Sequence, residues 1–151
     1  MPIQEHHYST AVQWSGGRSG SGTLTATPSQ TQLDIAVPTE FGGVGQVTNP
    51  EELLTSAVAG CYSITFGIIA DNRKLPVQSF ALDATGVVEQ NGASLTFKSI
   101  TLRPIIVLSP EATDQQVALA EDMSHKADNY CIVSNAVRDK VAITVEPTIS
   151  R

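Results

Sequence analysis

The sequence of 151 residues predicts an α+β fold in a single domain, residues 1–151. Three observations carry this prediction. Strand-like segments come in pairs that glycine-containing turns connect, a long helical segment separates two such groups, and a second helical segment follows the last pair. The resulting order β-β-β-α-β-β-α-β sets two main helices among antiparallel hairpins. It therefore favours α+β over a parallel doubly wound sheet, which needs regular alternation of strands and helices.

Three strands are expected first, over residues 8–14, 22–27 and 32–37. The Gly/Ser-rich stretch SGGRSGSG at 15–22 lies between the first two and is typical of a hairpin loop. A turn at Pro28 and Ser29 precedes the third strand.

The long helix is expected to begin after Asn49 and to run to about Asp71. Asn49 can cap it, Pro50 suits the first helical position, and Glu51 with Glu52 places acids in the first turn. Small residues at 59, 60 and 63 leave room for another helix. The predicted apolar stripe comprises Leu53, Leu54, Ala57, Val58, Cys61, Ile64, Thr65, Ile68 and Ile69.

A second hairpin is expected from strands at residues 80–90 and 94–108, joined at Asn91 and Gly92. Asn-Gly is a strong signal for a tight turn between strands. Pro104 lacks an N–H, so it predicts an edge position or a bulge in the second strand.

The second helical segment has a capping box at Thr113 and Gln116. A break near Asn129 comes before Cys131, a short helix over 132–139 is expected after it, and the last strand is predicted at 141–145. The face expected to pack inward comprises Val117, Ala120, Ser124 and Ala127.

Charge and composition argue against nucleic acids and membranes as binding partners. The net charge is −6, the pI is about 4.9, and the nine Lys and Arg residues are scattered, so no basic patch for nucleic acid is present. The amino terminus lacks a cationic segment followed by an apolar one, and we expect a cytoplasmic protein. The longest apolar stretch, 57–70, is interrupted short of the ~20 residues of a membrane span. It predicts a buried helix and no membrane partner.

The two cysteines, Cys61 and Cys131, could be catalytic, metal-binding or simply buried. Cys61 lies about three turns inside its helix, where the helix dipole is too weak to form a thiolate. A cation would have to be supplied, and a lone Cys on an apolar stripe is more often inert. Cys131 precedes a predicted helix start, where backbone amides can stabilise an anion.

Metal binding is the weakest of these alternatives. The cysteines are too far apart in sequence for a CxxC motif or a compact zinc site, and His6, His7 and His125 supply no ligand spacing. We therefore expect no metal and no organic cofactor. A pair of thiols without a metal suits a cycle of oxidation and disulfide closure.

The motifs around the cysteines resemble those of the OsmC/Ohr family of hydroperoxide reductases. NPEELLTSAVAGCYS is similar to the NPEEL…AAC signature, CIVSNAV to CPVSxAL, and GGRSG to the GGRDG loop of the organic hydroperoxide branch. The element order also matches the family's fold, so the resemblance covers essentially the whole chain. Two positions depart from the pattern or flank it: Ile132 replaces the usual Pro, and Tyr130 precedes Cys131.

The resemblance implies an enzyme that reduces organic hydroperoxides, and in some members hydrogen peroxide, in the response to oxidative stress. Cys61 would be the peroxidatic nucleophile, Cys131 the resolving thiol, Arg18 the cation and Glu51 its carboxylate partner. A guanidinium can stabilise a thiolate and bind peroxide oxygens, while a carboxylate holds it in place. A dithiol or a lipoylated protein would reduce the disulfide. Without the resemblance, Arg18 would pass for a solvated loop residue.

The resemblance also implies an intertwined homodimer with active sites at the interface. Ten residues of helix separate Glu51 from Cys61 by roughly 15 Å, so either Arg18 spans much of that gap or a partner chain supplies the carboxylate. Phe41, Tyr62 and Phe66 are candidates for a substrate pocket, although aromatic residues also occur in ordinary cores.

Two other functions fit the same scaffold. One is a binding protein whose buried cysteines are inert and whose cavity holds a small apolar ligand. The other is a redox sensor that forms the same disulfide without turnover. Consumption of both thiols by peroxide separates the enzyme from the binding protein, and repeated cycles with a dithiol separate it from the sensor.

Overall fold

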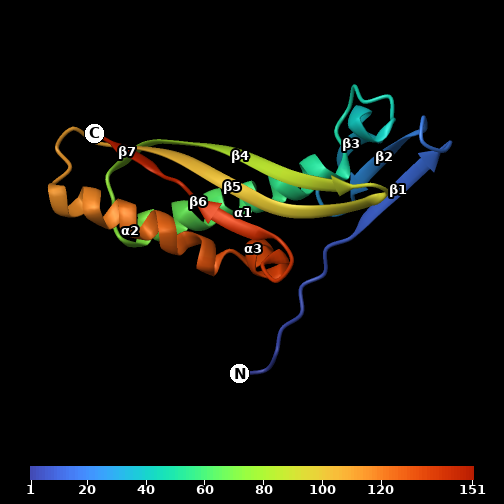
Figure 1. The fold of residues 1–151 in the computed structure, drawn as a ribbon. Coiled ribbons are helices and arrows are strands. Elements are labelled where there is room, and N and C mark those ends of the chain that lie inside the picture. The colour runs from blue at the N-terminus through green and yellow to red at the C-terminus, as the bar shows by residue number, and fades with distance from the viewer. The chain divides into compact units, whose positions relative to one another are not determined.

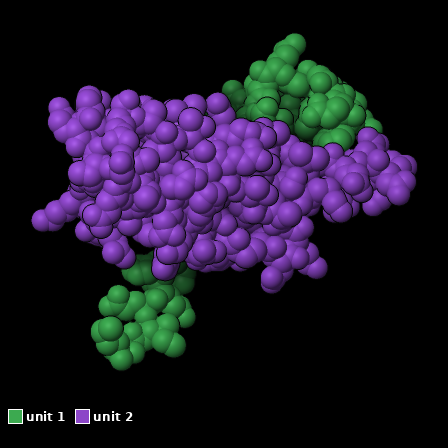
Figure 2. All heavy atoms as spheres, turned by 60° about the vertical axis from the view of Figure 1, so that its left-hand side comes forward, with its two compact units in different colours: residues 1–53 green, residues 54–151 purple.

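The computed structural model describes residues 1–151, which form two compact units (Figure 2). Unit 1 is Met1–Leu53 and unit 2 is Leu54–Arg151. The boundary falls within the first turn of helix α1 (Pro50–Asn72). Each unit has its own sheet.

Unit 1 contains an antiparallel sheet of order β1-β2-β3 (Figure 1). Its strands are Thr10–Ser15, Ser21–Ala26 and Thr31–Ala36. The predicted hairpin loop is confirmed, since Ser15 pairs with Ser21 across it. Gly20 is required there because a Cβ atom would lie 2.3 Å from the Ser15 carbonyl oxygen. A 3-10 helix, η1 (Thr39–Phe41), follows the sheet.

Helix α1 begins as the sequence predicts. The Asn49 side chain accepts a hydrogen bond of 2.9 Å from the Glu52 N–H, which is the expected N-terminal cap, and the helix ends at Asn72. Its buried face, however, consists of Val58, Tyr62, Phe66 and Ala70. The predicted stripe was therefore wrong in part.

Part of the predicted stripe on α1 is exposed, and Ile64 and Ile68 are 67% and 58% exposed. By length and composition alone, α1 could also cross a membrane. Its buried residues nevertheless belong to the hydrophobic core of unit 2. A central helix of a folded domain has the same length and composition.

Unit 2 is built on the long hairpin of β4 (Val77–Asn91) and β5 (Ser94–Leu108). Asn91 pairs with Ser94, which confirms the predicted hairpin. Gly92 is the first residue of the two-residue turn between these strands and has a φ of 61°. Two short strands, β6 (Ala142–Val145) and β7 (Thr148–Ser150), pair with β5 in parallel. The sequence indicated neither the parallel pairing nor β7.

Pro104 lies in β5, which is a central strand of its sheet. The prediction of an edge position or a bulge at this residue was therefore wrong. The register shifts of the hairpin occur elsewhere, between Val77 and Ser79 and between Val87 and Val88. The parallel partner is interrupted instead: β6 stops pairing at Leu102 and β7 starts at Ile105. No ladder hydrogen bond is needed at Pro104 on that side.

Two further helices complete unit 2: α2 (Asp114–Tyr130) and α3 (Ile132–Val137). The capping box is confirmed, because Thr113 and Gln116 exchange hydrogen bonds at the start of α2. Helices α1 and α2 lie along the same face of the sheet (Figure 1). The core between them contains Val58, Tyr62, Phe66, Ile100, Leu102, Ile106, Leu108, Ala120 and Ala127.

Candidate two-thiol site

The two cysteines of unit 2 lie within hydrogen-bonding reach of each other, although they are distant in the sequence. Cys61 is half-buried in the middle of α1, and Cys131 is fully buried at the junction between α2 and α3. Both are free thiols. Cys61 is therefore the partly accessible member of the pair, and Cys131 is the buried one.

The environment of Cys61 lowers the pKa of its thiol. Burial acts in the opposite direction, but hydrogen bonds favour the thiolate and outweigh it. They come from the Cys131 thiol, the Val133 amide, the Thr65 hydroxyl and the Ile132 amide. The sequence predicted that a cation would be needed, whereas the groups that act on Cys61 within unit 2 are neutral donors. Most of them belong to the segment that begins α3.

Cys131 has the opposite character. Burial raises the pKa of its thiol. The hydrogen bond to Cys61 raises it further, because Cys131 is the donor and must keep its proton to make this bond. The side chain and the amide of Ser134 lower this pKa, but by less. The Ser134 N–H lies 3.4 Å from Cys131 Sγ, where the sulfur caps α3. The pair thus combines an exposed thiol that ionises easily with a buried one that keeps its proton.

Ile132, which stands where the family resemblance implies Pro, contributes to this asymmetry. Its backbone N–H is one of the groups that lower the pKa of Cys61, and proline has no N–H to donate. Cys131 has φ −74° and ψ 116°, a conformation that a following proline accepts. Helix α3 starts at Ile132 without the proline.

This donor can be tested by pH. Because the thiolate is the reactive form, a lowered pKa shifts the rise in alkylation rate to lower pH. We expect the reaction of Cys61 with iodoacetamide to titrate at a lower pH than that of an ordinary, solvent-exposed thiol. Ile132→Pro should move the profile to higher pH, and Ile132→Ala, which keeps the N–H, should not. A wild-type profile centred at or above the ordinary value would contradict the assignment.

The α2–α3 junction that carries Cys131 is fixed by a hydrogen-bonded cluster. Arg138 Nη1 donates to Asp128 Oδ2 at 2.8 Å and Nη2 donates to the Asp128 carbonyl oxygen at 3.0 Å. Arg138 also contacts Asn135 Oδ1, and the Asn135 side chain donates to the Asn129 carbonyl oxygen at 3.0 Å. The cluster joins the last turn of α2 to α3 and so holds the donors around Cys61. No sequence motif indicated it.

Two of the three pocket candidates are corrected. Tyr62 and Phe66 are buried in the core of unit 2, where Phe66 also stacks on Phe80 at 5.3 Å between ring centroids. The Tyr62 hydroxyl donates to the Ser124 carbonyl oxygen at 2.7 Å, and burial together with the Asp128 charge raises its pKa. Neither ring is available to substrate, because tight packing takes up its surface.

The remaining predicted residues lie in unit 1. Phe41 is half-buried in η1, and its carbonyl oxygen accepts a hydrogen bond of 3.0 Å from Arg18 Nη1. Arg18 therefore lies within the predicted hairpin loop, and this hydrogen bond anchors its side chain to η1. Glu51 lies in the first turn of α1, as expected for an acid at a helix N-terminus.

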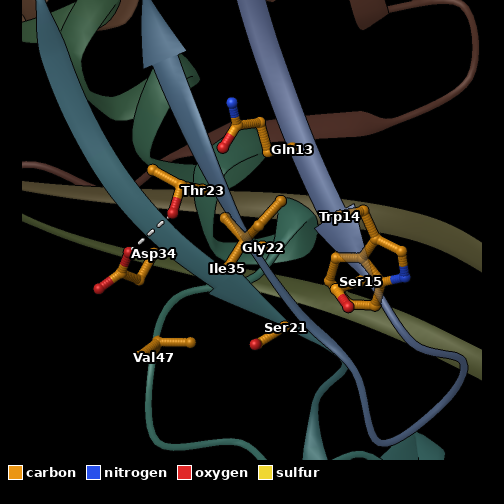
Figure 3. Close-up of a pocket in the computed structure, with 9 residues that line it drawn as sticks. All are labelled: Gln13, Trp14, Ser15, Ser21, Gly22, Thr23, Asp34, Ile35 and Val47. Atoms are coloured by element: carbon orange, nitrogen blue, oxygen red, sulfur yellow. Dashed lines mark hydrogen bonds between the residues drawn. The ribbon is translucent and has the colours of Figure 1, made fainter.

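A separate hollow of about 470 Å³ lies on the sheet of unit 1 (Figure 3). Gly22 makes room for the indole of Trp14, since a Cβ atom at Gly22 would lie 2.8 Å from the ring. Thr23 donates to Asp34 at 3.2 Å along the same wall. No residue predicted for the site lines the hollow, which is formed by Gln13, Trp14, Ser15, Ser21, Gly22, Thr23, Asp34, Ile35 and Val47.

No group of three or more His, Cys, Asp or Glu side chains is arranged to hold a metal ion. The fold and the paired sulfurs define an α+β protein with a candidate dithiol site. The sequence profile of the OsmC-like protein family matches residues 43–146. The chain belongs to the OsmC-like protein family.

Individual relatives agree with this family. The chain is 32% identical to the uncharacterized protein YmaD of Bacillus subtilis, over 97% of each chain. It is 25% identical to organic hydroperoxide resistance protein-like 2 of Staphylococcus saprophyticus, over 95% of this chain and 96% of that one. An OsmC-like protein of Vibrio cholerae shares the fold with a TM-score of 0.81 at 20% identity, over 95% of this chain and all of that one.

Proposed function

We propose that this chain is a thiol-dependent peroxidase that reduces organic hydroperoxides through Cys61 and Cys131. One observation carries the proposal: the two thiols are hydrogen-bonded, and they differ in both exposure and the direction of their pKa shifts. Cys61 is the accessible sulfur with the lowered pKa, which are the properties of a peroxidatic cysteine. The relatives named for organic hydroperoxide resistance support the substrate class.

In the proposed cycle, the Cys61 thiolate attacks the distal oxygen of the hydroperoxide. The O–O bond breaks, the alkoxide takes a proton and leaves as alcohol, and Cys61 becomes a sulfenic acid. Cys131 then forms a bond to the Cys61 sulfur and water leaves. A dithiol, either small or carried on a lipoylated protein, restores both thiols by exchange. We propose that this occurs in the reducing cytoplasm.

Exposed apolar side chains favour an organic substrate over hydrogen peroxide. Tyr130 and Ile132, which flank Cys131, are 68% and 81% exposed. Ile132 also lies next to Cys61, since its amide is hydrogen-bonded to that sulfur. Apolar surface there can bind an alkyl chain by removing it from water. Hydrogen peroxide offers no such group.

The roles that the resemblance implies for Arg18 and Glu51 belong to the proposal as well. A guanidinium would hydrogen-bond the peroxide oxygens in a geometry that an ammonium does not reproduce. Arg18→Lys should therefore lower kcat/KM for cumene hydroperoxide by about tenfold or more. Arg73→Lys, the same change at another exposed arginine, provides the control and should have no effect. Unchanged kcat/KM in the Arg18 variant would remove this residue from the mechanism.

We also propose a homodimer that uses the exposed face of α1. Ala57, Gly60, Ile64 and Ile68 recur at helical spacing on this face and are exposed in the single chain. Two glutamates, Ile64→Glu and Ile68→Glu together, should dissociate the dimer. Sedimentation of the wild-type protein should give about twice 16.0 kDa, and a fully active monomer would contradict this part of the proposal.

A steady-state assay tests the function directly. With dihydrolipoamide as reductant, cumene hydroperoxide should be turned over repeatedly, and with a higher kcat/KM than hydrogen peroxide. In the absence of reductant, peroxide should consume both thiols in a single turnover. If the count of free thiols stays unchanged after peroxide, the chain is not a peroxidase of this kind.

A further inference from the structure

Ser134 is a buried residue beside the resolving sulfur for which the mechanism above has no role. It lies in the first turn of α3 and is fully buried. Its Oγ atom makes no hydrogen bond of good geometry, although it lies near enough to Cys131 Sγ to favour the thiolate of that residue. A buried hydroxyl without a partner destabilises a protein, because it has lost its hydrogen bonds to water. Its presence therefore requires an explanation.

The nearest chemical explanation is Cys131, three residues earlier. The Ser134 N–H already lies 3.4 Å from Cys131 Sγ, so the serine is on the sulfur's side of the helix turn. A neutral thiol is a weak acceptor, whereas a thiolate accepts strong hydrogen bonds. The influence of the Ser134 side chain on Cys131 is in that direction, since it favours the thiolate. The hydroxyl would thus gain a good partner only when Cys131 ionises.

Ionisation of Cys131 is the difficult part of disulfide closure. The attacking species in thiol chemistry is the thiolate, and Cys131 is fully buried, so burial holds its proton in place. No cationic side chain contacts the sulfur among the groups that act on it. A donor that stabilises the anion, but not the thiol, would accelerate this step selectively.

We propose that Ser134 is a catalytic residue of disulfide closure, whose hydroxyl donates a hydrogen bond to Cys131 Sγ as that sulfur becomes a thiolate. This inference rests on the proposed function. Cys131 loses its proton and its thiolate attacks the Cys61 sulfur of the sulfenic acid. The S–O bond breaks, and the departing hydroxide takes up the proton to leave as water. Ser134 keeps its own proton, and no further oxidant or reductant is involved.

The test is Ser134→Ala under single turnover with cumene hydroperoxide. Trapping with dimedone measures the sulfenic acid on Cys61. Disulfide closure is measured by the loss of free thiols and by the intact mass of the protein. We expect formation of the sulfenic acid at the wild-type rate and closure slower by about tenfold or more, the effect of one hydrogen bond to a charged group. The melting temperature should stay the same or rise, because an unsatisfied buried hydroxyl has been removed.

Ser124→Ala is the matched control. Ser124 is equally buried, but its hydroxyl donates to the Glu121 carbonyl oxygen at 2.7 Å. Its replacement should lower stability somewhat and leave the closure rate unchanged. If Ser134 had only a structural role, the Ser134→Ala protein would also have a lower melting temperature than the wild type. That outcome would overturn the proposal.

A second measurement does not depend on peroxide. In a Cys61→Ser background, ultraviolet absorbance of the thiolate reports the ionisation of Cys131, and Ser134→Ala should shift it to higher pH. An unchanged titration, or normal closure after normal oxidation of Cys61, would overturn the role of Ser134 alone. Failure of wild-type Cys61 to form a sulfenic acid would instead overturn the peroxidase proposal.

Discussion

Replacing Cys61 by serine is expected to reduce turnover of cumene hydroperoxide by at least about a thousandfold, to the uncatalysed background. A serine hydroxyl is not ionised near neutral pH, so the hydrogen bonds that favour the Cys61 thiolate have no anion to stabilise. The measurement is peroxide consumption with dihydrolipoamide in excess. Ser63→Ala serves as the control on the same helix, because Ser63 only donates to the Ala59 carbonyl oxygen.

Cys131→Ser should give a different defect. The first oxidation of Cys61 would still occur, but the sulfenic acid would persist and the intact mass would show one added oxygen atom. Serine keeps an O–H donor at position 131, so Cys131→Ala, which has no donor, is the variant that should raise the pKa of Cys61. Equal activity of the two serine variants would show that the cysteines do not have separate roles.

Arg138→Ala is expected to cost about 2–3 kcal/mol of unfolding free energy. It leaves the carboxylate of Asp128, whose side chain is 7% exposed, without its cation, and Asp128 Oδ1 already lacks a hydrogen-bond partner. The side chain of Arg138 is 36% exposed, so water would compensate part of the loss. The value is therefore below that of a fully buried pair. Urea denaturation, with both the midpoint and the slope of the transition, measures it.

Two variants separate charge from packing in this cluster. Lys126→Ala removes the exposed ion pair with Asp122 on the same helix and should cost less than about 1 kcal/mol. Asp128→Asn added to Arg138→Ala removes the unpaired charge and should recover part of the stability. If Arg138→Ala is no more destabilising than Lys126→Ala, the cluster does not hold the α2–α3 junction.

The sequence predicted those parts of the fold that depend on local chemistry. Asn49 and the Thr113–Gln116 pair cap helices where their hydrogen-bonding side chains indicated, and the glycine-containing turns join strands. These signals are reliable because the interacting groups lie a few residues apart. They are therefore encoded in short segments that can be read directly.

Long-range features could not be predicted in the same way. Helix α1 carries apolar residues on nearly all sides, so its periodicity did not distinguish the buried Val58 and Phe66 from the exposed Ile64 and Ile68. The tolerance of Pro104 depends on a gap between two parallel strands that come much later in the chain. Both features are decided by which segments meet in space.

The candidate site likewise has a part that the sequence predicted and a part that depends on the folded structure. The cysteines and their motifs identified a dithiol family, but the source of the lowered pKa of Cys61 was expected to be a cation. Within unit 2 the groups that lower this pKa are Cys131, Thr65 and the amides of the segment that begins α3, and most of these are distant from Cys61 in the sequence. Ser134 lies within the CIVSNAV motif but received no role from it, and Arg138 lies outside every motif, because the roles of both depend on burial and on partners in the folded structure.

The hydrogen bond between the two thiols also bears on how the protein would withstand an excess of its own substrate. A sulfenic acid exposed to more peroxide proceeds to sulfinic acid, an oxidation that is irreversible in nearly all proteins. Here Cys131 is already adjacent to Cys61, so closure is intramolecular and needs no unfolding of α2 or α3. A second peroxide molecule must compete with a neighbour whose effective concentration exceeds that of any dissolved oxidant. Overoxidation should therefore be rare, and the inactivating dose of peroxide correspondingly high.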